Sequence, residues 1–135
     1  MSNFQWQDPF HLDEQLTADE RMIRDAAYEY CQGKLMPRVQ DMFRHEKTDA
    51  SIFREMGELG LLGPTIPTEY GGAGLSYLTY IACCEELAKY CASTSIMFSV
   101  HGSLCSWPIL EFGTEEQKQK YLVPLAQGEK LGAMG

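Results

Sequence analysis

This sequence of 135 residues has no surplus of basic residues. It contains 11 lysines and arginines against 19 aspartates and glutamates, for a net charge of −8. Nucleic-acid binding depends on clustered positive charge that neutralises phosphates, so we exclude nucleic acid as a partner. The N-terminus also lacks the charged-then-apolar order of a signal peptide and the arginine-rich character of a transit peptide.

No stretch of the chain predicts a membrane span. A spanning helix needs about 20 predominantly apolar residues, and the most apolar part of this chain, from Ile96 to Phe112, carries serines, a histidine and a glycine. Internal repeats and low-complexity segments are also missing. Hydrophobic residues make up 44% of the chain and charged residues 22%, which predicts one folded domain rather than a disordered segment.

No two of the five cysteines have the spacing of metal ligands, so we expect no metal site. Their number is odd, and most of them lie within or beside predicted helices. We interpret them as small buried hydrophobic side chains in a reducing compartment. They are Cys31, Cys83, Cys84, Cys91 and Cys105.

A complete catalytic set is missing as well. The glycines of Gly71–Gly74 lack the Gly-Lys-Ser/Thr of a phosphate loop and indicate a tight turn instead. Glu85 and Glu86 diverge by about 100° on a helix, so they cannot act together on one atom. His101, alone on an apolar helix, is interpreted as a packed residue rather than a ligand. Residue chemistry alone therefore leaves the function open.

What the sequence does contain is a series of helix signals. Thr17 with Glu20, and Thr114 with Gln117, form two capping boxes that open helices. Ser76 is expected to cap the helix that ends near residue 91, and glycine and proline residues predict bends or stops between helices. We predict an all-α fold of five or six helices. Residues 1–16 are expected to form an arm whose aromatic side chains dock on the body.

The most informative stretch runs from Glu85 to Phe112. Residues 91–94 should break the chain between two helices, with Ser93 or Thr94 capping the second. Apolar residues surround the second helix on all sides, which is typical of a core helix, and Pro108 should bend it. Its small and polar residues leave room for a ligand or for a neighbouring backbone to approach.

Several separated motifs closely resemble the N-terminal helical domain of acyl-CoA dehydrogenases, in the same order and spacing over nearly the whole chain. They are Leu59-Gly60-Leu61-Leu62-Gly63, Glu69-Tyr70-Gly71-Gly72-Ala73-Gly74-Leu75, Glu85-Glu86-Leu87-Ala88, Ser99-Val100-His101, Pro108-Ile109 and Gly113-Thr114-Glu115-Glu116-Gln117 with the five residues that follow. The resemblance implies an arm at residues 1–16, the helical domain at 17–128, and the start of a middle β domain at 129–135.

The resemblance also implies a function for the whole protein. Enzymes of this family hold FAD between a middle β-barrel-like domain and a C-terminal four-helix bundle, work as homotetramers, and pass electrons to an electron-transferring flavoprotein. They dehydrogenate an acyl-CoA thioester between its α and β carbons. The catalytic glutamate lies in the C-terminal domain, so the resemblance places no catalytic, FAD-binding or metal-binding residue in this chain. The expected location is the cytoplasm, or the mitochondrial matrix in a eukaryote.

The acyl pocket is the part of the site that the resemblance does place here, in its helical wall. The expected substrate-binding residues are Ser95, Ile96, Phe98, Ser99 and Leu104. Residues 91–94 and 98–100 are similar to the short-chain, butyryl-type members, whereas the N-terminal arm is similar to glutaryl-CoA dehydrogenase.

Position 95 decides the predicted substrate. Glutaryl-CoA dehydrogenases carry an arginine there, suited to a distal carboxylate, and Ser95 offers only one neutral hydrogen bond. We therefore expect a short monocarboxylic acyl-CoA as substrate. The alternatives are a glutaryl-CoA dehydrogenase, which decarboxylates its substrate oxidatively, and a free-standing helical module that binds a partner without catalysis.

Overall fold

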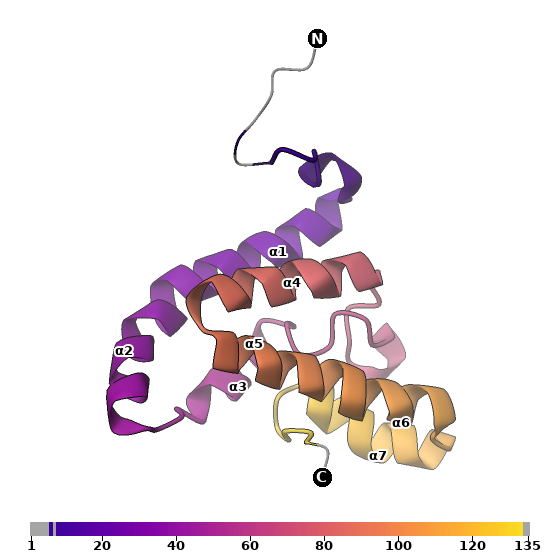
Figure 1. The fold of residues 1–135 in the computed structure, drawn as a ribbon. Helices are drawn as coiled ribbons and strands as arrows, with labels where there is room; N and C mark the ends of the chain where they lie inside the picture. Colours follow the sequence, from indigo (N-terminus) through magenta and orange to yellow (C-terminus); the bar gives the residue numbers. More distant parts are fainter. Residues whose placement is uncertain (1–5, 7, 134–135) are drawn as a thin grey trace.

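The computed structural model describes residue 6 and residues 8–133 (Figure 1). The described residues contain helices and no strand, which confirms the predicted all-α class. The α-helices are α1 (Ala18–Tyr30), α2 (Met36–His45), α3 (Ser51–Glu58), α4 (Tyr77–Tyr90), α5 (Ala92–Ser99), α6 (Trp107–Phe112) and α7 (Glu115–Ala126), with 3₁₀ turns at Asp13–Gln15 and Thr68–Tyr70.

Two π-helical segments join neighbouring α-helices into longer rods. Cys31–Leu35 connects α1 to α2, and Val100–Ser106 connects α5 to α6, so the described chain forms five continuous helices. Pro37 and Pro108 each lie in the first turn after a π segment. A proline ring collides with the carbonyl one turn earlier in an α-helix, and a widened turn relieves that collision. Each helix therefore continues through its proline, and the expected interruption takes the form of a π-helical turn.

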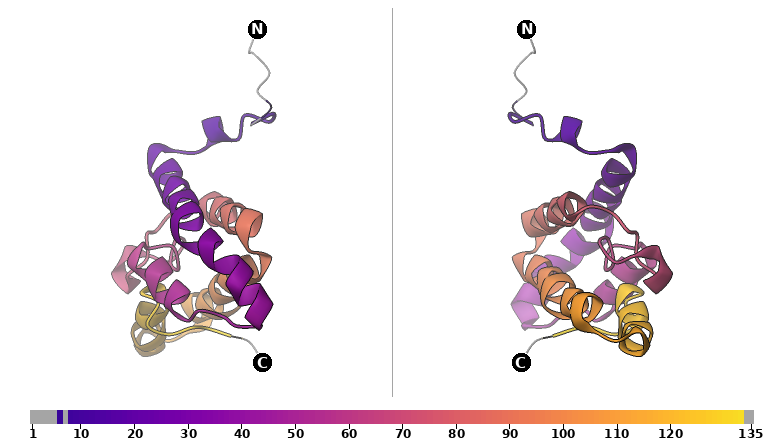
Figure 2. Two further views of the ribbon diagram at one scale, coloured as in Figure 1. Left: turned by 90° about the vertical axis from the view of Figure 1, so that its left-hand side faces the viewer. Right: turned by 90° about the vertical axis from the view of Figure 1, so that its right-hand side faces the viewer.

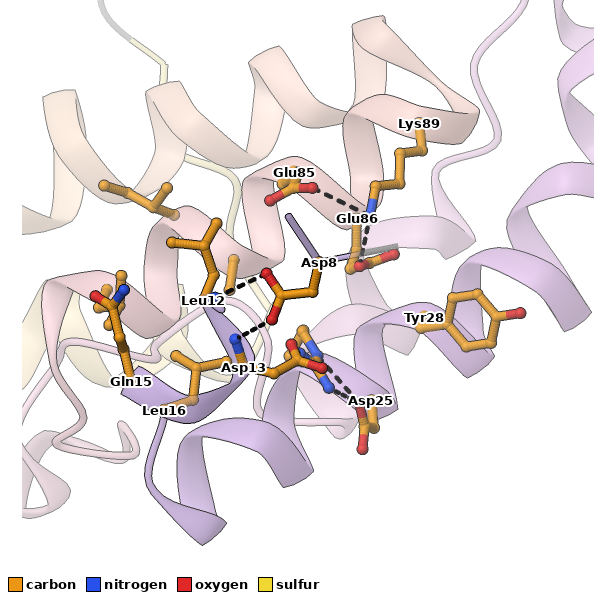
Figure 3. A pocket seen from close by; sticks show the side chains of 14 residues that line it. Asp8, Leu12, Asp13, Gln15, Leu16, Asp25, Tyr28, Glu85, Glu86 and Lys89 are labelled. Atoms are coloured by element: carbon orange, nitrogen blue, oxygen red, sulfur yellow. Dashed lines mark hydrogen bonds and ion pairs between the residues drawn. The ribbon is translucent and has the colours of Figure 1, made fainter. Parts of the chain in front are cut away.

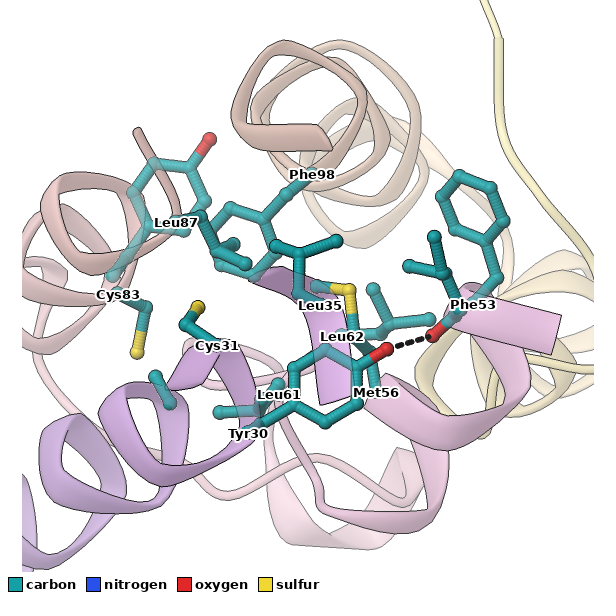
Figure 4. Close-up of a cluster of buried hydrophobic side chains, with 13 residues drawn as sticks. Tyr30, Cys31, Leu35, Phe53, Met56, Leu61, Leu62, Cys83, Leu87 and Phe98 are labelled. Carbon is teal, nitrogen blue, oxygen red and sulfur yellow. Dashed lines mark hydrogen bonds between the residues drawn. The ribbon is translucent and has the colours of Figure 1, made fainter. Parts of the chain in front are cut away.

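Figure 2 shows the helices gathered into one body, and the main core of buried hydrophobic side chains is supplied chiefly by α1, α3, α4, α5 and the first π segment. Helix α1 lies against α4, α4 lies against α5, and α6 lies against α7. Figure 4 shows buried side chains that converge on the main core from several elements, namely Leu35 of the first π segment, Met56 of α3, Leu87 of α4 and Phe98 of α5. A smaller cluster around Leu122 attaches the loop at residues 66–70 to α7. The long loop before α4 is thereby held to the body.

Both predicted capping boxes are present. The backbone N–H of Glu20 donates to Thr17 Oγ1 at 3.3 Å, and the N–H of Thr17 donates to Glu20 Oε2 at 2.8 Å. The equivalent pair joins Thr114 and Gln117. Ser76 occupies the N-cap position of α4 but makes no side-chain cap bond, and its hydroxyl donates to Glu20 Oε1. That bond and the Thr17 bonds lower the pKa of Glu20 to about 2.

Two further predictions need correction. Helix α5 begins at Ala92 with Cys91 at its N-cap and no side-chain cap bond, so neither Ser93 nor Thr94 caps it. Phe10 is 77% exposed, so its ring does not dock on the body as expected; Trp6 is 84% exposed, and Phe4 lies outside the described residues. Residues 129–133 belong to no helix or strand, and the N–H of Gly132 donates to the side chain of the buried His101. No helix within the described residues is long and apolar enough to cross a membrane.

The helix expected to be apolar on all sides is covered on only part of its circumference. Phe98 is 1% exposed, whereas Ile96 is 63% and Leu104 is 44% exposed. The buried positions of α5 and the following π segment include polar residues, Thr94 and Ser106. A rod that buries polar groups and exposes apolar ones presents a surface for further contacts.

Candidate functional site

A groove of about 360 Å³ opens between the start of α4 and the rod formed by α5 and α6. Its walls carry three aromatic rings and no charged side chain. It is lined by Thr65, Tyr77, Tyr80, Gly102, Ser103 and Trp107. An uncharged, largely aromatic groove suits an apolar ligand, because a charged group entering it would lose water without gaining a partner.

Tyr80 forms the floor of the groove and is held from three sides. Its hydroxyl donates to the carbonyl oxygen of Ser99 at 2.9 Å and approaches Ser99 Oγ at 3.2 Å. Its ring stacks on that of Phe98 with the centroids 5.2 Å apart, and the centroid of the Tyr77 ring, which is also on α4, lies 5.1 Å from that of Tyr80. Burial raises the pKa of Tyr80, so its hydroxyl remains a neutral donor.

The π segment supplies the opposite wall. Ser103 Oγ donates to the carbonyl of Ser99 at 2.7 Å, and Ser106 Oγ donates to the carbonyl of His101 at 3.0 Å. The carbonyl of Ser99 thus accepts hydroxyl groups from both Ser103 and Tyr80, which ties the π segment to α4. π-helical turns inside α-helices occur frequently at functional sites. Gly102 within this segment brings the backbone close to Tyr80.

His101 is packed and satisfied, as predicted. It is fully buried, and the N–H of Gly132 donates to its Nδ1 at 3.1 Å. The proton therefore resides on Nε2, which donates to the carbonyl of Leu125 at 3.1 Å. Burial lowers the pKa of His101, which keeps the imidazole neutral. The residue joins the central rod to α7 and to the segment after it, and it does not face the groove.

The five residues expected to bind substrate fall into three environments. Ser95 and Ser99 lie on the seam between α5 and α4, where Ser95 Oγ donates to the carbonyl of Cys84 at 2.9 Å. Phe98 lies in the core behind Tyr80, and Ile96 and Leu104 are exposed.

The groove itself is lined by residues that the sequence did not identify as site residues. For Gly102 and Ser103 a signal existed, since small residues on this apolar stretch indicated room for an approaching group. Nothing in the sequence identified Tyr77 and Tyr80 as site residues, because they approach the central rod only through a tertiary contact.

The remaining chemical candidates behave as structural elements. The glycine turn uses its own backbone groups: the N–H of Gly72 donates to Pro67, and that of Gly74 donates to Ile66. Gly71 and Gly74 both have positive φ, which explains the glycines at these positions. All five cysteines are free, and among the described residues no cluster of side chains could hold a metal ion.

Comparison with known proteins identifies relatives over this region. The sequence profile of the family "Acyl-CoA dehydrogenase, N-terminal domain" matches residues 17–129. The short-chain specific acyl-CoA dehydrogenase of Clostridium acetobutylicum is 43% identical over 124 residues, which is 92% of this chain and 33% of that protein. The chain thus spans about a third of the length of the curated relatives that it matches.

Solved structures are similar over the same region. Butyryl-CoA dehydrogenase from Megasphaera elsdenii matches with a TM-score of 0.81 and 39% identity, over 86% of this chain and 31% of that chain. Glutaryl-CoA dehydrogenase from Mycobacterium smegmatis matches with a TM-score of 0.81 and 34% identity, over 89% of this chain and 31% of that chain. A chain in a structure of the electron transferring flavoprotein of Acidaminococcus fermentans matches with a TM-score of 0.83 and 46% identity, over 86% of this chain and 30% of that chain.

Proposed function

This chain belongs to the acyl-CoA dehydrogenase family, and on that premise we propose that it builds the helical wall of the acyl pocket in a dehydrogenase of short-chain acyl-CoA thioesters. The proposed reaction removes hydrogen from the α and β carbons of the acyl group. The proposed boundaries are residues 17–128 for the helical domain, with an arm before it and the start of a middle domain from residue 129.

The uncharged groove at Tyr80 is the observation that carries this proposal. An acyl chain of a few carbons is apolar and neutral, and the groove offers it three aromatic rings without a charge. The exposed side chains of Ile96 and Leu104 extend the apolar surface along the same rod. In the proposed site, Ser99 and Phe98 hold Tyr80 in place, and the exposed residues contact the chain or the domains that enclose it.

Ser95 supports a monocarboxylic substrate over glutaryl-CoA. A distal carboxylate would need a cation or several hydrogen-bond donors to replace its water. The single hydroxyl proton of Ser95 is already donated to Cys84, and no residue that lines the groove carries a positive charge. The identities to the short-chain and butyryl relatives, at 43% and 39%, also exceed the 34% to the glutaryl relative.

FAD is the proposed cofactor of the whole enzyme, and the glycine turn of this chain does not fit its phosphates. A phosphate cradle needs free backbone N–H groups. In the turn at residues 71–74, the N–H groups of Gly71, Gly72, Ala73 and Gly74 all donate to carbonyls of the chain itself. We therefore assign the flavin and the catalytic base to residues outside this chain, and derive no reaction step through the cofactor.

The other proposed attributes follow the family. An electron-transferring flavoprotein is the proposed electron acceptor, and the similarity to a chain in a structure of such a flavoprotein supports it. A homotetramer is the proposed assembly. The proposed location is the cytoplasm, or the mitochondrial matrix if the source is eukaryotic.

A photoreactive substrate tests where the acyl chain lies. The full-length protein would be irradiated with a butyryl-CoA analogue that carries a diazirine at the end of the acyl chain, and the labelled peptides would be mapped by mass spectrometry. Labelling of peptides containing Tyr77, Tyr80 or residues 96–107, prevented by excess butyryl-CoA, would support the proposal. Competed labelling confined to other parts of the protein would contradict it.

A further inference from the structure

A pocket of about 630 Å³ lies between the end of α2 and the junction that joins α4 to α5 (Figure 1). Helix α2 and the loop at residues 46–48 form one wall, and Tyr90, Cys91 and the first turn of α5 form the other. No residue lines both this pocket and the groove at Tyr80. The proposed dehydrogenase function makes no use of the pocket.

The first turn of α5 carries backbone N–H groups without a partner. Cys91 occupies the N-cap position and makes no side-chain cap bond. The N–H of Ser95 donates to the carbonyl of Cys91 at 3.0 Å, whereas no described residue accepts a hydrogen bond from the N–H groups of residues 92–94. Ala92 and Ser93 are exposed, so a ligand has access to this turn. Free N–H groups at the start of a helix favour an anion.

Thr94 is an independent sign of a ligand at the same place. It lines the pocket and is only 1% exposed. Its hydroxyl makes no hydrogen bond within the part of the chain that the structure describes, yet Oγ1 remains accessible, whereas Thr79 Oγ1 is fully closed to solvent. Buried hydroxyl groups are nearly always bonded. An unpartnered hydroxyl in the wall of a pocket therefore indicates a partner that enters the pocket.

The charge of the pocket also favours an anion. Arg44 and Lys47 line it, and neither forms an ion pair with another described residue. Glu46 is the one carboxylate among the lining residues, which leaves one positive charge in excess. The chain as a whole has a net charge of −8. This local excess of positive charge is therefore opposite in sign to the rest of the molecule.

The pocket drawn in Figure 3, between the N-terminal segment, α1 and α4, shows the contrast. Its two cations are both paired within the chain. Lys89 Nζ lies 3.2 Å from Glu85 and 2.8 Å from Glu86, and Arg24 lies 2.8 Å from Asp25. At the start of α5 the cations have no such partners, so they are available to an external anion.

Apolar and aromatic surface lies beside these donors. Phe43 lines the pocket with its side chain 84% exposed, and Met42, Tyr90 and Met97 line it as well. An exposed aromatic ring offers a face on which a ring of a ligand can stack. A ligand with an anionic group and an aromatic body would use both parts of the pocket.

We propose that this pocket binds a phosphate monoester that carries an aromatic ring. A phosphate group has three strong acceptor oxygens, which match the N–H groups of residues 92 and 93 and the hydroxyl of Thr94. Arg44 and Lys47 pair with its charge, and the ring of the ligand lies on Phe43. The ester belongs either to a free nucleotide or to a phosphotyrosine side chain of a protein partner.

Phenyl phosphate is the direct probe, titrated by calorimetry into the full-length protein with its FAD bound. We expect a dissociation constant of about 1 mM, as suits so small a ligand. Benzyl alcohol keeps the ring without the charge and should bind at least about tenfold more weakly. Inorganic phosphate keeps the charge without the ring and should bind at least about threefold more weakly. No binding of phenyl phosphate, or equal binding of phenyl phosphate and either control, would overturn the proposal.

Matched variants assign the donors. Thr94→Val removes the accessible hydroxyl at nearly the same volume, and Thr79→Val removes an unpartnered hydroxyl outside the pocket. Arg44→Gln removes a lining cation, and Arg54→Gln removes an exposed one elsewhere. We expect Thr94→Val and Arg44→Gln each to weaken binding at least about threefold, and their controls to leave it unchanged. Full affinity in both proteins, with unchanged circular dichroism spectra, would overturn the assignment.

Two larger ligands distinguish the sources of the ester. Adenosine monophosphate represents a nucleotide, and N-acetylphosphotyrosine methylamide represents a protein side chain. The ligand that binds more tightly, and loses affinity in the Arg44→Gln protein, identifies the source. Weaker binding of both than of phenyl phosphate would overturn the proposed class of ligand.

Discussion

Gly102 lies directly against the ring of Tyr80. A Cβ atom at position 102 would come within 2.9 Å of Tyr80 Cε2, closer than side-chain contacts allow. The ring cannot easily withdraw, because its hydroxyl is bonded to Ser99 and its face is stacked on Phe98. The width of the groove at this point therefore depends on the missing side chain.

Gly102→Ala should destabilise the protein and narrow the groove. Overpacking at a tight contact costs about 1–3 kcal/mol in the free energy of unfolding, and the KM for a short acyl-CoA should rise because Tyr80 must shift. Chemical denaturation and steady-state kinetics of the full-length protein measure the two effects. Gly33→Ala is the control: Gly33 lies in the other π segment with nothing within 4 Å of its added Cβ. An equal loss in both variants would refute the role of the contact.

Local sequence signals predicted much of the fold. The capping boxes at Thr17 and Thr114 were found because all of their atoms lie within one helical turn. Ser76 had the same appearance in sequence, yet its hydroxyl reaches Glu20, 56 positions earlier in the chain. Such a tertiary bond fixes where the side chain points, and it leaves no trace in a single sequence. The π segments were recognised only as interruptions, at Gly33 and Pro37 and at Pro108.

The candidate site was predicted less well than the fold. The central rod and its small residues were identified, but a helix that is apolar on all sides does not reveal which side faces a ligand. Phe98 was therefore expected at the pocket and lies in the core, whereas Tyr77 and Tyr80 were missed. Their contribution depends on how α4 and α5 pack together.

Ser95→Arg should shift substrate preference toward glutaryl-CoA. An arginine at this position would supply the paired donors that a distal carboxylate needs, so the ratio of kcat/KM for glutaryl-CoA to that for butyryl-CoA should rise at least about tenfold. Ser93→Arg, at an exposed position on the same helix, is the control and should leave the ratio unchanged. An identical ratio in both variants would show that residue 95 does not face the end of the acyl chain.

The free energy of unfolding should decrease as the pH is lowered, because His101 becomes protonated. Burial lowers the pKa of this side chain from its ordinary value of 6.5. The unfolded chain therefore binds the proton first, and the stability gained from the neutral imidazole is complete above pH 6.5 and is lost as the pH falls towards the lowered pKa. Protonated Nδ1 also cannot accept the N–H of Gly132.

Unfolding free energies between about pH 5 and pH 7.5 test this dependence. His101→Gln should flatten the slope of stability against pH. Equal slopes in the wild type and the His101→Gln protein would contradict the assignment.

The 135-residue chain on its own should bind hydrophobic dyes and self-associate. Ile96, Trp107 and Phe112 are exposed on the central rod, and an apolar surface of this kind favours association. Light scattering and dye fluorescence measure both properties, and Ile96→Ser with Phe112→Ser should reduce them. A monomer that melts cooperatively and binds no dye would contradict this expectation.

The most direct measurement is the ratio of kcat/KM for butyryl-CoA to that for glutaryl-CoA in the full-length enzyme, with an electron acceptor in excess. The uncharged groove at Tyr80 and the committed hydroxyl of Ser95 predict a ratio above one, by at least about tenfold. Formation of the enoyl-CoA without release of carbon dioxide should accompany it. A higher kcat/KM for glutaryl-CoA, with carbon dioxide released, would contradict the account.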